Sequence, residues 1–365
     1  FIVSIAFNVG LIVFFKYLPF FISNINNILS LHIPVPKTAL PLGISFYTFK
    51  VITYHVDVYR GIVPPQKNFI CHALYISLFP QLTAGPIVKY SAIFKQLENR
   101  DHSLNMLARG ITKFILGLGK KVILSNNLAL IADSVFNFKS GTFGALAAWI
   151  GLVSYSLQIY FDFSGYSDMA IGLCRMFGFE IDENFNYPYI SKSASEFWRR
   201  WHISLGSFFR DYVYIPLGGS RCESQLANYH NLFIVWILTG LWHGASWNFI
   251  IWGLYFGFLI ALERAFLLNL LSKLPRFFQH CYLIIAAMLG WVFFRTDNIS
   301  HAILYFKRLF GAGSTIDLVN PLLLLHDNYL LLIVAILACT PLFKSIVLSL
   351  AKHRFFPYAA GFGLI

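Results

Sequence analysis

ILTGLWHGASWNFIIWG, residues 237–253, is an apolar run with a histidine, His243, near its centre. Such a run is typical of a helix that spans a membrane or lies inside a large bundle. A titratable side chain within a bilayer costs roughly 2.5 kcal/mol or more, so a chain that keeps one usually pairs it or uses it. The surrounding sequence has to show which of these applies to His243.

Composition predicts a membrane protein. Of the 365 residues, 57% are hydrophobic and only 12% are charged, which lies outside the range of ordinary soluble domains. At about 20 apolar residues per span, the length allows roughly eight to ten helices in one bundle. We therefore expect an all-α, polytopic membrane helix bundle with a single domain, residues 1–365. The chain begins at Phe1 without a methionine or a signal pattern, so we also expect that N-terminal helices are missing.

The net charge of +12 does not indicate nucleic-acid binding, because the basic residues alternate with apolar segments instead of forming one solvated face. By the positive-inside bias we expect the basic stretch between Lys89 and Lys121 on the cytoplasmic side. Five cysteines without a CxxC pair predict neither a disulfide framework nor a zinc site. We expect no bound metal or cofactor, and we place the chain in the lipid bilayer.

Several segments are predicted to span the bilayer: residues 1–22, 143–163, the run after His243 to 265, 282–294 and 329–350. The first of these is apolar apart from Lys16. Between them, Ser193 and Glu196 have the spacing of a capping box. Apolar residues recur behind this cap at three- and four-residue steps, which predicts an amphipathic helix that does not span. Its charged side consists of Arg199, Arg200, His202 and Arg210.

If the helix continues through His243, its neighbours are residues that make a tight, aromatic crevice: Trp236, Gly240, Trp247 and Ile250. Gly240 and Gly244 have the small-xxx-small spacing that lets another backbone approach. Two interpretations stay open for His243: a structural histidine paired with a carbonyl, or a base that takes the proton of a hydroxyl attacking a thioester. His202, Asp162 and Asp168 could assist the second. No HExxH, GxSxG or P-loop motif is present.

Three motifs carry a resemblance to a known family: QIYFDFSGYSDMAIGL, NFNYPYISKSASEFWRRWHISLGSFFRDYVYIPLGG and GLWHGASWNFIIWG. With PLGISFYTFKVITYHVDVYRG and LFPQLTAGP, they resemble the membrane-bound O-acyltransferase (MBOAT) family over nearly the whole chain. Within it they are similar to the bacterial branch that contains the membrane subunits of alginate and peptidoglycan O-acetyltransferases.

The resemblance implies amphipathic and re-entrant helices around a central tunnel in the bacterial cytoplasmic membrane. It implies an O-acyltransferase that moves an acyl group, most simply acetyl, from a cytoplasmic thioester such as acetyl-CoA toward a cell-envelope polysaccharide. The family's two histidines correspond to His243, the residue usually held essential, and His202. It also implies a partner, an extracytoplasmic SGNH-type acetyltransferase subunit.

The remaining candidate residues have structural interpretations beside the functional ones. Arg199 and Arg200 suit either interface anchoring or contact with the donor's phosphates. Asp162 and Asp168 suit interhelical hydrogen bonding as well as catalysis. Four tryptophans are expected to pack first and to line the donor tunnel second: Trp198, Trp201, Trp242 and Trp247.

Three alternatives stay open for the function. The acyl group could be D-alanine with teichoic acid as the end acceptor. The chain could be a proton-coupled transporter or flippase, whose buried histidines and aspartates relay protons. It could also be a structural scaffold, in which case His243 is dispensable.

Overall fold

The computed structural model describes residues 1–138, 142–222, 224–312 and 318–350, and within these ranges it contains helices and loops but no strand. Its first α-helices are α1 (Ile2–Ile12), α2 (Leu18–Leu29), α3 (Ile44–Tyr59), α4 (Phe69–Ser77), α5 (Tyr90–Glu98), α6 (Leu104–Gly119), α7 (Asn126–Phe136) and α8 (Ala145–Met176). The later ones are α9 (Ala194–Arg200), α10 (Ile203–Phe209), α11 (Gln225–His243), α12 (Trp247–Leu262), α13 (Leu268–Leu271), α14 (Arg276–Arg295), α15 (Ile299–Leu309), α16 (Pro321–Ala338) and α17 (Pro341–Leu350).

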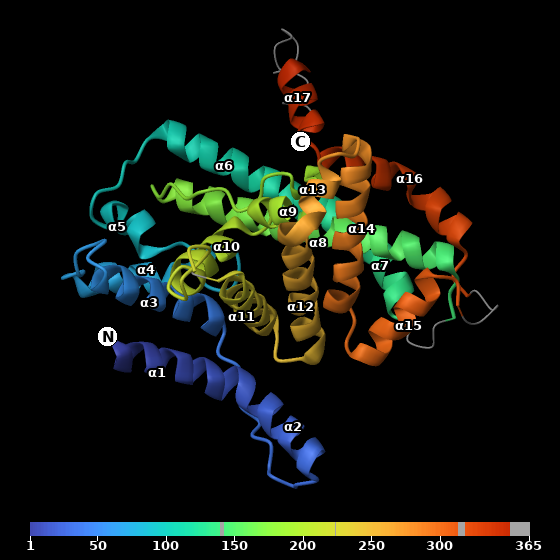
Figure 1. Ribbon diagram of the computed structural model, residues 1–365. Helices are drawn as coiled ribbons and strands as arrows, with labels where there is room; N and C mark the ends of the chain where they lie inside the picture. Colours follow the sequence, from blue (N-terminus) through green and yellow to red (C-terminus); the bar gives the residue numbers. More distant parts are fainter. Residues whose placement is uncertain (139–141, 223, 313–317, 351–365) are drawn as a thin grey trace.

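Tighter and wider helical turns interrupt this pattern. Short 3₁₀ turns lie at Phe79–Gln81 and Pro188–Ile190, and π-helical turns lie at Val13–Tyr17, Lys120–Ser125, Arg210–Tyr214 and Glu263–Leu267. Figure 1 shows α12 and α14 side by side in the bundle, with α11 next to α12 and with α1 and α2 along one edge. The all-α helix bundle is therefore confirmed.

Within the described residues, five helical stretches are long and apolar enough to cross a membrane: Ile2–Leu29, Leu104–Phe136, Trp247–Leu271, Arg276–Arg295 and Pro321–Ala338. They confirm the predicted spans at the N terminus, after His243 and around residues 282–294. The stretch from 104 to 136 was not predicted, because its lysines looked like those of a loop. Residues 329–350 are divided between α16 and α17, since Pro341 disfavours a helical residue before it.

The predicted span at 143–163 belongs to α8, which is not among these five stretches. This 32-residue helix is enclosed by its neighbours and buries polar side chains such as Ser156 and Ser164. Glycines bring α6 and α8 into close contact. A Cβ on Gly117 would lie 2.6 Å from the carbonyl oxygen of Gly165, and one on Gly172 would lie 2.7 Å from that of Gly110. Small residues of this kind let two helix backbones touch.

The helix through His243 is not continuous, and that expectation was wrong. α11 ends at His243, the backbone of Gly244 is extended, and α12 starts at Trp247. The two helices fold back on each other as a hairpin. The predicted close approach at Gly240 is confirmed, since a Cβ there would lie 2.2 Å from the carbonyl oxygen of Phe249. His243 thus stands at the tip of a hairpin, as the last residue of α11.

The amphipathic segment is also broken, at His202. Its predicted cap is present, because the hydroxyl of Ser193 accepts a hydrogen bond from the backbone of Glu196 at 3.1 Å. The helix stops after Arg200, however, because loop residues take the backbone groups that a longer helix needs. Asn186 N–H donates to the carbonyl of Arg200, and Ile203 N–H donates to that of Asn184, both at 2.9 Å. His202 itself is left-handed, with φ +46°.

Candidate active site

His243 lies within a group of aromatic rings. Trp242, Trp252 and Phe294 meet its imidazole edge-on, with ring centroids 4.8, 4.9 and 5.0 Å away. The side chain is half-buried, and no hydrogen bond joins its ring to any residue that the structure describes. Both ring nitrogens are therefore available to a substrate, and the structural interpretation with a carbonyl partner has no support in these contacts.

His202 is the more deeply buried histidine, with only 1% of its surface exposed. Its Nδ1 lies 3.2 Å from Oδ1 of Asn184, which also accepts hydrogen bonds from Ser204 N–H and Oγ. Because an amide oxygen only accepts, Nδ1 must carry the proton, which leaves the lone pair on Nε2. That Nε2 is buried and has no partner among the described residues.

Burial also sets the charge of His202. It disfavours the imidazolium, and the nearby His243 adds to this effect, so the pKa of His202 is held well below its ordinary value. Its ring is therefore neutral at physiological pH. A neutral imidazole with an unoccupied nitrogen is the form that accepts a proton in general base catalysis.

Trp242 stands between the two histidines. Its ring centroid is 5.8 Å from that of His202 and 4.8 Å from that of His243. Phe163 on α8 also meets the ring of His202 edge-on, with the ring centroids 4.6 Å apart. The two histidines that the sequence singled out are thus brought together across one indole, although α10 and most of α11 lie between them in the chain.

Unpaired indole N–H groups lie close to this pair, on Trp242 and Trp252, which contact the histidines, and on Trp198, which contacts Trp252. The Nε1 atoms of Trp198, Trp242 and Trp252 are buried without a hydrogen-bond partner among the described residues. Trp252 is only 1% exposed, and its ring lies 5.4 Å from that of Trp198. An unpaired buried donor costs about 1–3 kcal/mol, so such groups are rare and call for a physical reason. An acceptor atom on a substrate would supply one.

The other two predicted tryptophans have different surroundings. Trp201 is buried against Trp291, with ring centroids 4.9 Å apart. Trp247 is 50% exposed, and its N–H donates to Asn24 of α2 at 2.8 Å. The contacts of Trp247 thus lead to α2 and not to the histidines.

The two predicted aspartates lie on α8 and face lysines. Asp162 pairs with Lys121, and Asp168 pairs with Lys113 at 2.9 Å and with Lys120 at 2.6 Å. These ion pairs join α8 to the helix that continues from α6 into α7. Within the described part of the chain, neither carboxylate is hydrogen-bonded to an imidazole, so the predicted assistance to the histidines remains a prediction.

The two predicted arginines differ in the number of partners that their guanidinium groups have. Arg200 pairs with Glu196 at 2.9 Å and donates to the carbonyl of Asn186 at 3.2 Å. Arg199 is exposed, and no contact of its guanidinium with another described residue is recorded. Of the two, Arg199 is the one available to an anionic group of a donor.

Two residues of the site were not predicted. Trp252 belongs to the apolar run 237–253, but a continuous helix would have turned its side chain away from His243. Asn184 precedes the amphipathic segment in a loop, and no local pattern marks it as a partner of His202. Both become visible only when the hairpin and the helix break are known.

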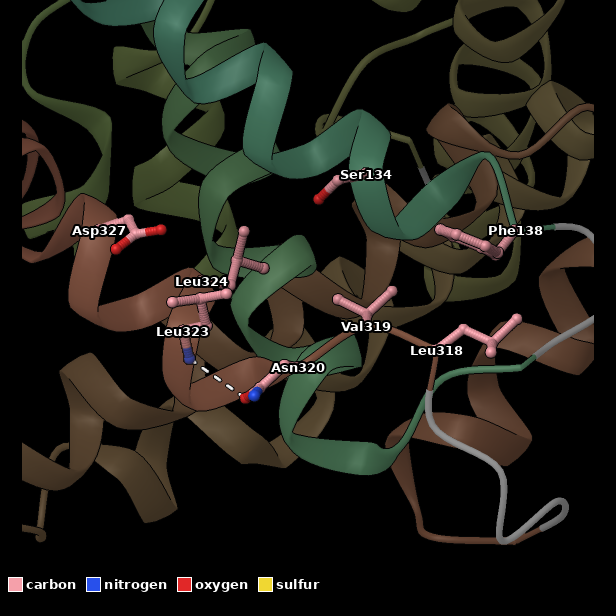
Figure 2. A pocket seen from close by; sticks show the side chains of 8 residues that line it. All are labelled: Ser134, Phe138, Leu318, Val319, Asn320, Leu323, Leu324 and Asp327. Carbon is pink, nitrogen blue, oxygen red and sulfur yellow. Dashed lines mark hydrogen bonds between the residues drawn. The ribbon is translucent and has the colours of Figure 1, made fainter.

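A separate cavity of about 290 Å³ lies between the end of α7 and the start of α16 (Figure 2). Its lining consists of Ser134, Phe138, Leu318, Val319, Asn320, Leu323, Leu324 and Asp327. The hydroxyl of Ser134 donates to the carbonyl of Ile131. Because no histidine lines it, this cavity is distinct from the candidate active site.

Comparison with known proteins agrees with the resemblance. Residues 65–302 match the family model "MBOAT, membrane-bound O-acyltransferase family". The chain is 44% identical to a probable alginate O-acetylase of Azotobacter vinelandii, over 82% of this chain and 60% of that protein. It is 36% identical to a peptidoglycan O-acetyltransferase of Helicobacter pylori, over 96% and 72%. A teichoic acid D-alanyltransferase of Bacillus subtilis is 31% identical, over 68% and 66%. The chain thus spans about 60% of the length of the first of these relatives.

Proposed function

The chain belongs to the membrane-bound O-acyltransferase family and is a multi-pass membrane protein, and from this premise we propose that it is an O-acyltransferase of the bacterial cytoplasmic membrane. It moves an acetyl group from a cytoplasmic thioester toward a cell-envelope polysaccharide of the alginate or peptidoglycan type. The names of the relatives at 44% and 36% identity support acetyl transfer. The D-alanyltransferase at 31% makes D-alanine the second candidate.

One observation carries the chemistry. Two histidines with unpaired ring nitrogens lie on either side of Trp242, among buried indole donors that also lack partners. In this proposal His243 removes the proton from the attacking hydroxyl, or carries the acyl group transiently, and His202 assists from the donor side. The indole N–H groups donate to the acyl carbonyl oxygen as it becomes negative.

The step balances as follows for direct transfer. The acceptor oxygen gives its proton to the imidazole and bonds to the carbonyl carbon, while the π pair moves onto the carbonyl oxygen. The carbonyl then re-forms, the C–S bond breaks, and the sulfur leaves with its bonding pair. The thiolate takes up the proton that the imidazole held, so the histidine is regenerated.

The donor and the partner are part of the same proposal. The donor is acetyl-CoA or another acyl thioester, with Arg199 near its phosphates and Trp198, Trp201, Trp242 and Trp247 along a tunnel. We further propose that residues 1–365 act as one transmembrane domain. An extracytoplasmic SGNH-type subunit then places the acetyl group on sugar hydroxyls.

The test is acetyl transfer in proteoliposomes that contain the chain, acetyl-CoA, polysaccharide and the partner subunit. His243→Ala should reduce transfer to background, because it removes the base without removing any recorded hydrogen bond. His326→Ala is the matched control, since His326 is exposed and its only recorded contact is with Asp327. Transfer by His243→Ala at the wild-type rate and equal abundance contradicts the proposal. Proton flux without acyl turnover supports the transporter instead.

A further inference from the structure

Lys16 places a positive charge inside the first candidate span, Ile2–Leu29. It stands in the π-helical turn Val13–Tyr17 that joins α1 to α2. A charged residue within a spanning helix is costly and is a functional candidate by default. Single π turns inside α-helices are also frequent at functional sites. Both features raise the question of what the ammonium of Lys16 meets.

The ammonium points to the end of α11. Lys16 Nζ donates to the carbonyl of Trp242 and, at 3.2 Å, to the hydroxyl of Ser45. The next residue, Tyr17, donates its hydroxyl to the carbonyl of Leu241 at 2.6 Å. Carbonyls in the last turn of a helix have no partner within that helix. The π turn therefore anchors the first span to α11 directly before His243.

Among the described residues, Lys16 has no anionic partner. The ammonium of Lys16 donates to two neutral oxygens and lies 5.7 Å from the centroid of the Tyr17 ring, and no carboxylate of the described chain forms an ion pair with it. Lys113 and Lys120, by contrast, both face Asp168. The ammonium of Lys16 lies instead at the backbone carbonyl of Trp242, the residue directly before His243. In apolar surroundings an unpaired cation is costly unless a negative charge arrives, and the reacting thioester supplies one.

We propose that Lys16 belongs to the acyl-transfer centre and that its ammonium stabilises the negative charge that develops beside His243. This inference rests on the proposed function. The charge first appears on the carbonyl oxygen when the acceptor oxygen bonds to the carbon, and then on the sulfur when the C–S bond breaks. Lys16 keeps its proton throughout, while the proton of the acceptor hydroxyl passes through His243 to the thiolate.

Three variants test the inference in the proteoliposome assay with the partner present. Lys16→Met removes the charge and keeps an unbranched side chain that is one atom shorter, and Lys16→Arg keeps the charge. Tyr17→Phe is the matched control, because it removes the neighbouring anchor to α11 without changing any charge. We expect Lys16→Met to lower kcat roughly 10²-fold, as the loss of one oxyanion-stabilising group does elsewhere, with little change in KM. Lys16→Arg should recover much of the loss, and Tyr17→Phe should stay near wild type.

The outcomes separate this inference from the proposed function. A Lys16→Met protein with wild-type kcat beside an inactive His243→Ala protein overturns the inference alone. Equal losses of kcat in Tyr17→Phe and Lys16→Met would show that Lys16 anchors the first span to α11 and does not act through its charge. An effect of Lys16→Met on KM alone would show that Lys16 binds the donor. Either outcome overturns the inference. If Lys16→Met does not accumulate, Lys16→Gln keeps a donor without the charge and must show the same loss of kcat. Absence of transfer by the wild-type chain refutes the proposed function itself.

Discussion

Glu263 should be essential for the folded conformation of the segment that carries His202. This carboxylate is 1% exposed and lies where α12 becomes a π-helical turn. One of its oxygens accepts from Ala194 N–H at 2.5 Å and from the Tyr282 hydroxyl at 3.0 Å. The other accepts from Ser195 N–H at 2.8 Å and from its hydroxyl at 2.6 Å. Glu263 thereby holds the first backbone donors of α9, the helix that leads into His202.

Glu263→Gln keeps the shape but turns one oxygen into an NH₂ group. Whichever oxygen is replaced, the hydroxyl that donated to it can rotate and accept a hydrogen bond from the new NH₂ group. The backbone N–H of α9 that donated to the same oxygen can only donate, so it loses its acceptor. That N–H loses a charge-assisted bond of about 1.5–3 kcal/mol. The N–H of the fully buried Ala194 would also stay unpaired at a further cost of about 1–3 kcal/mol, whereas Ser195 is only half-buried. We therefore expect a destabilisation of about 1.5–6 kcal/mol.

The assay is reversible unfolding in mixed micelles by titration with SDS. Ser195→Ala is the control, because it removes one hydroxyl donor and leaves every backbone N–H paired, at a cost of about 1.5 kcal/mol. If Glu263→Gln is no less stable than Ser195→Ala, the carboxylate does not hold α9 as we infer.

Three further predictions follow from the same contacts. Trp252→Phe removes an unpaired N–H beside His243 and should lower kcat about tenfold or more. Trp291→Phe is the control, because the N–H of Trp291 donates to Tyr189, and its loss should affect stability more than turnover. Equal effects on turnover in the proteoliposome assay would contradict a role for the free N–H. Gly253→Ala should lower the free energy of unfolding measured by SDS titration by about 1–3 kcal/mol or more, because its Cβ would lie 2.2 Å from the carbonyl oxygen of Trp236. Gly10→Ala serves as the control, since a Cβ at Gly10 meets no atom within 4 Å. The lowered pKa of His202 means that only the unfolded chain takes up a proton there as pH falls through about 6.5. Stability measured from pH 8 to 5 should therefore decline below about pH 6.5, and less so in His202→Gln; equal slopes in both proteins would show that His202 is not the group responsible.

Local features were predictable from the sequence because they depend on neighbours along the chain. Apolar runs predicted the spans at the N terminus and after His243. Ser193 was identified as a cap from the residues that follow it, and the close approach at Gly240 was expected from its spacing to Gly244. The motifs of the family to which the chain belongs pointed to His202 and His243, and their catalytic roles stay a prediction.

Contacts between distant segments were not predictable, and they decide the site. His202 is left-handed because Asn184 and Asn186, from a preceding loop, take backbone groups that a continuous helix would have used. The lysines from 113 to 121 lie in a helix because α8 offers them carboxylates, which no pattern of loop charges reveals.

The same holds for the surroundings of His243. Periodicity assumed that the helix continues, but the chain turns at Gly244 and brings Trp252 against the imidazole from the opposite direction. Lys16 reaches the carbonyl of Trp242 across 226 positions of sequence. Hydropathy along the chain therefore identified most of the segments that can cross a membrane, although it missed residues 104–136. Only the packing of those segments decided which polar groups meet there, because a buried donor or charge pairs with whatever the folded chain brings within its reach.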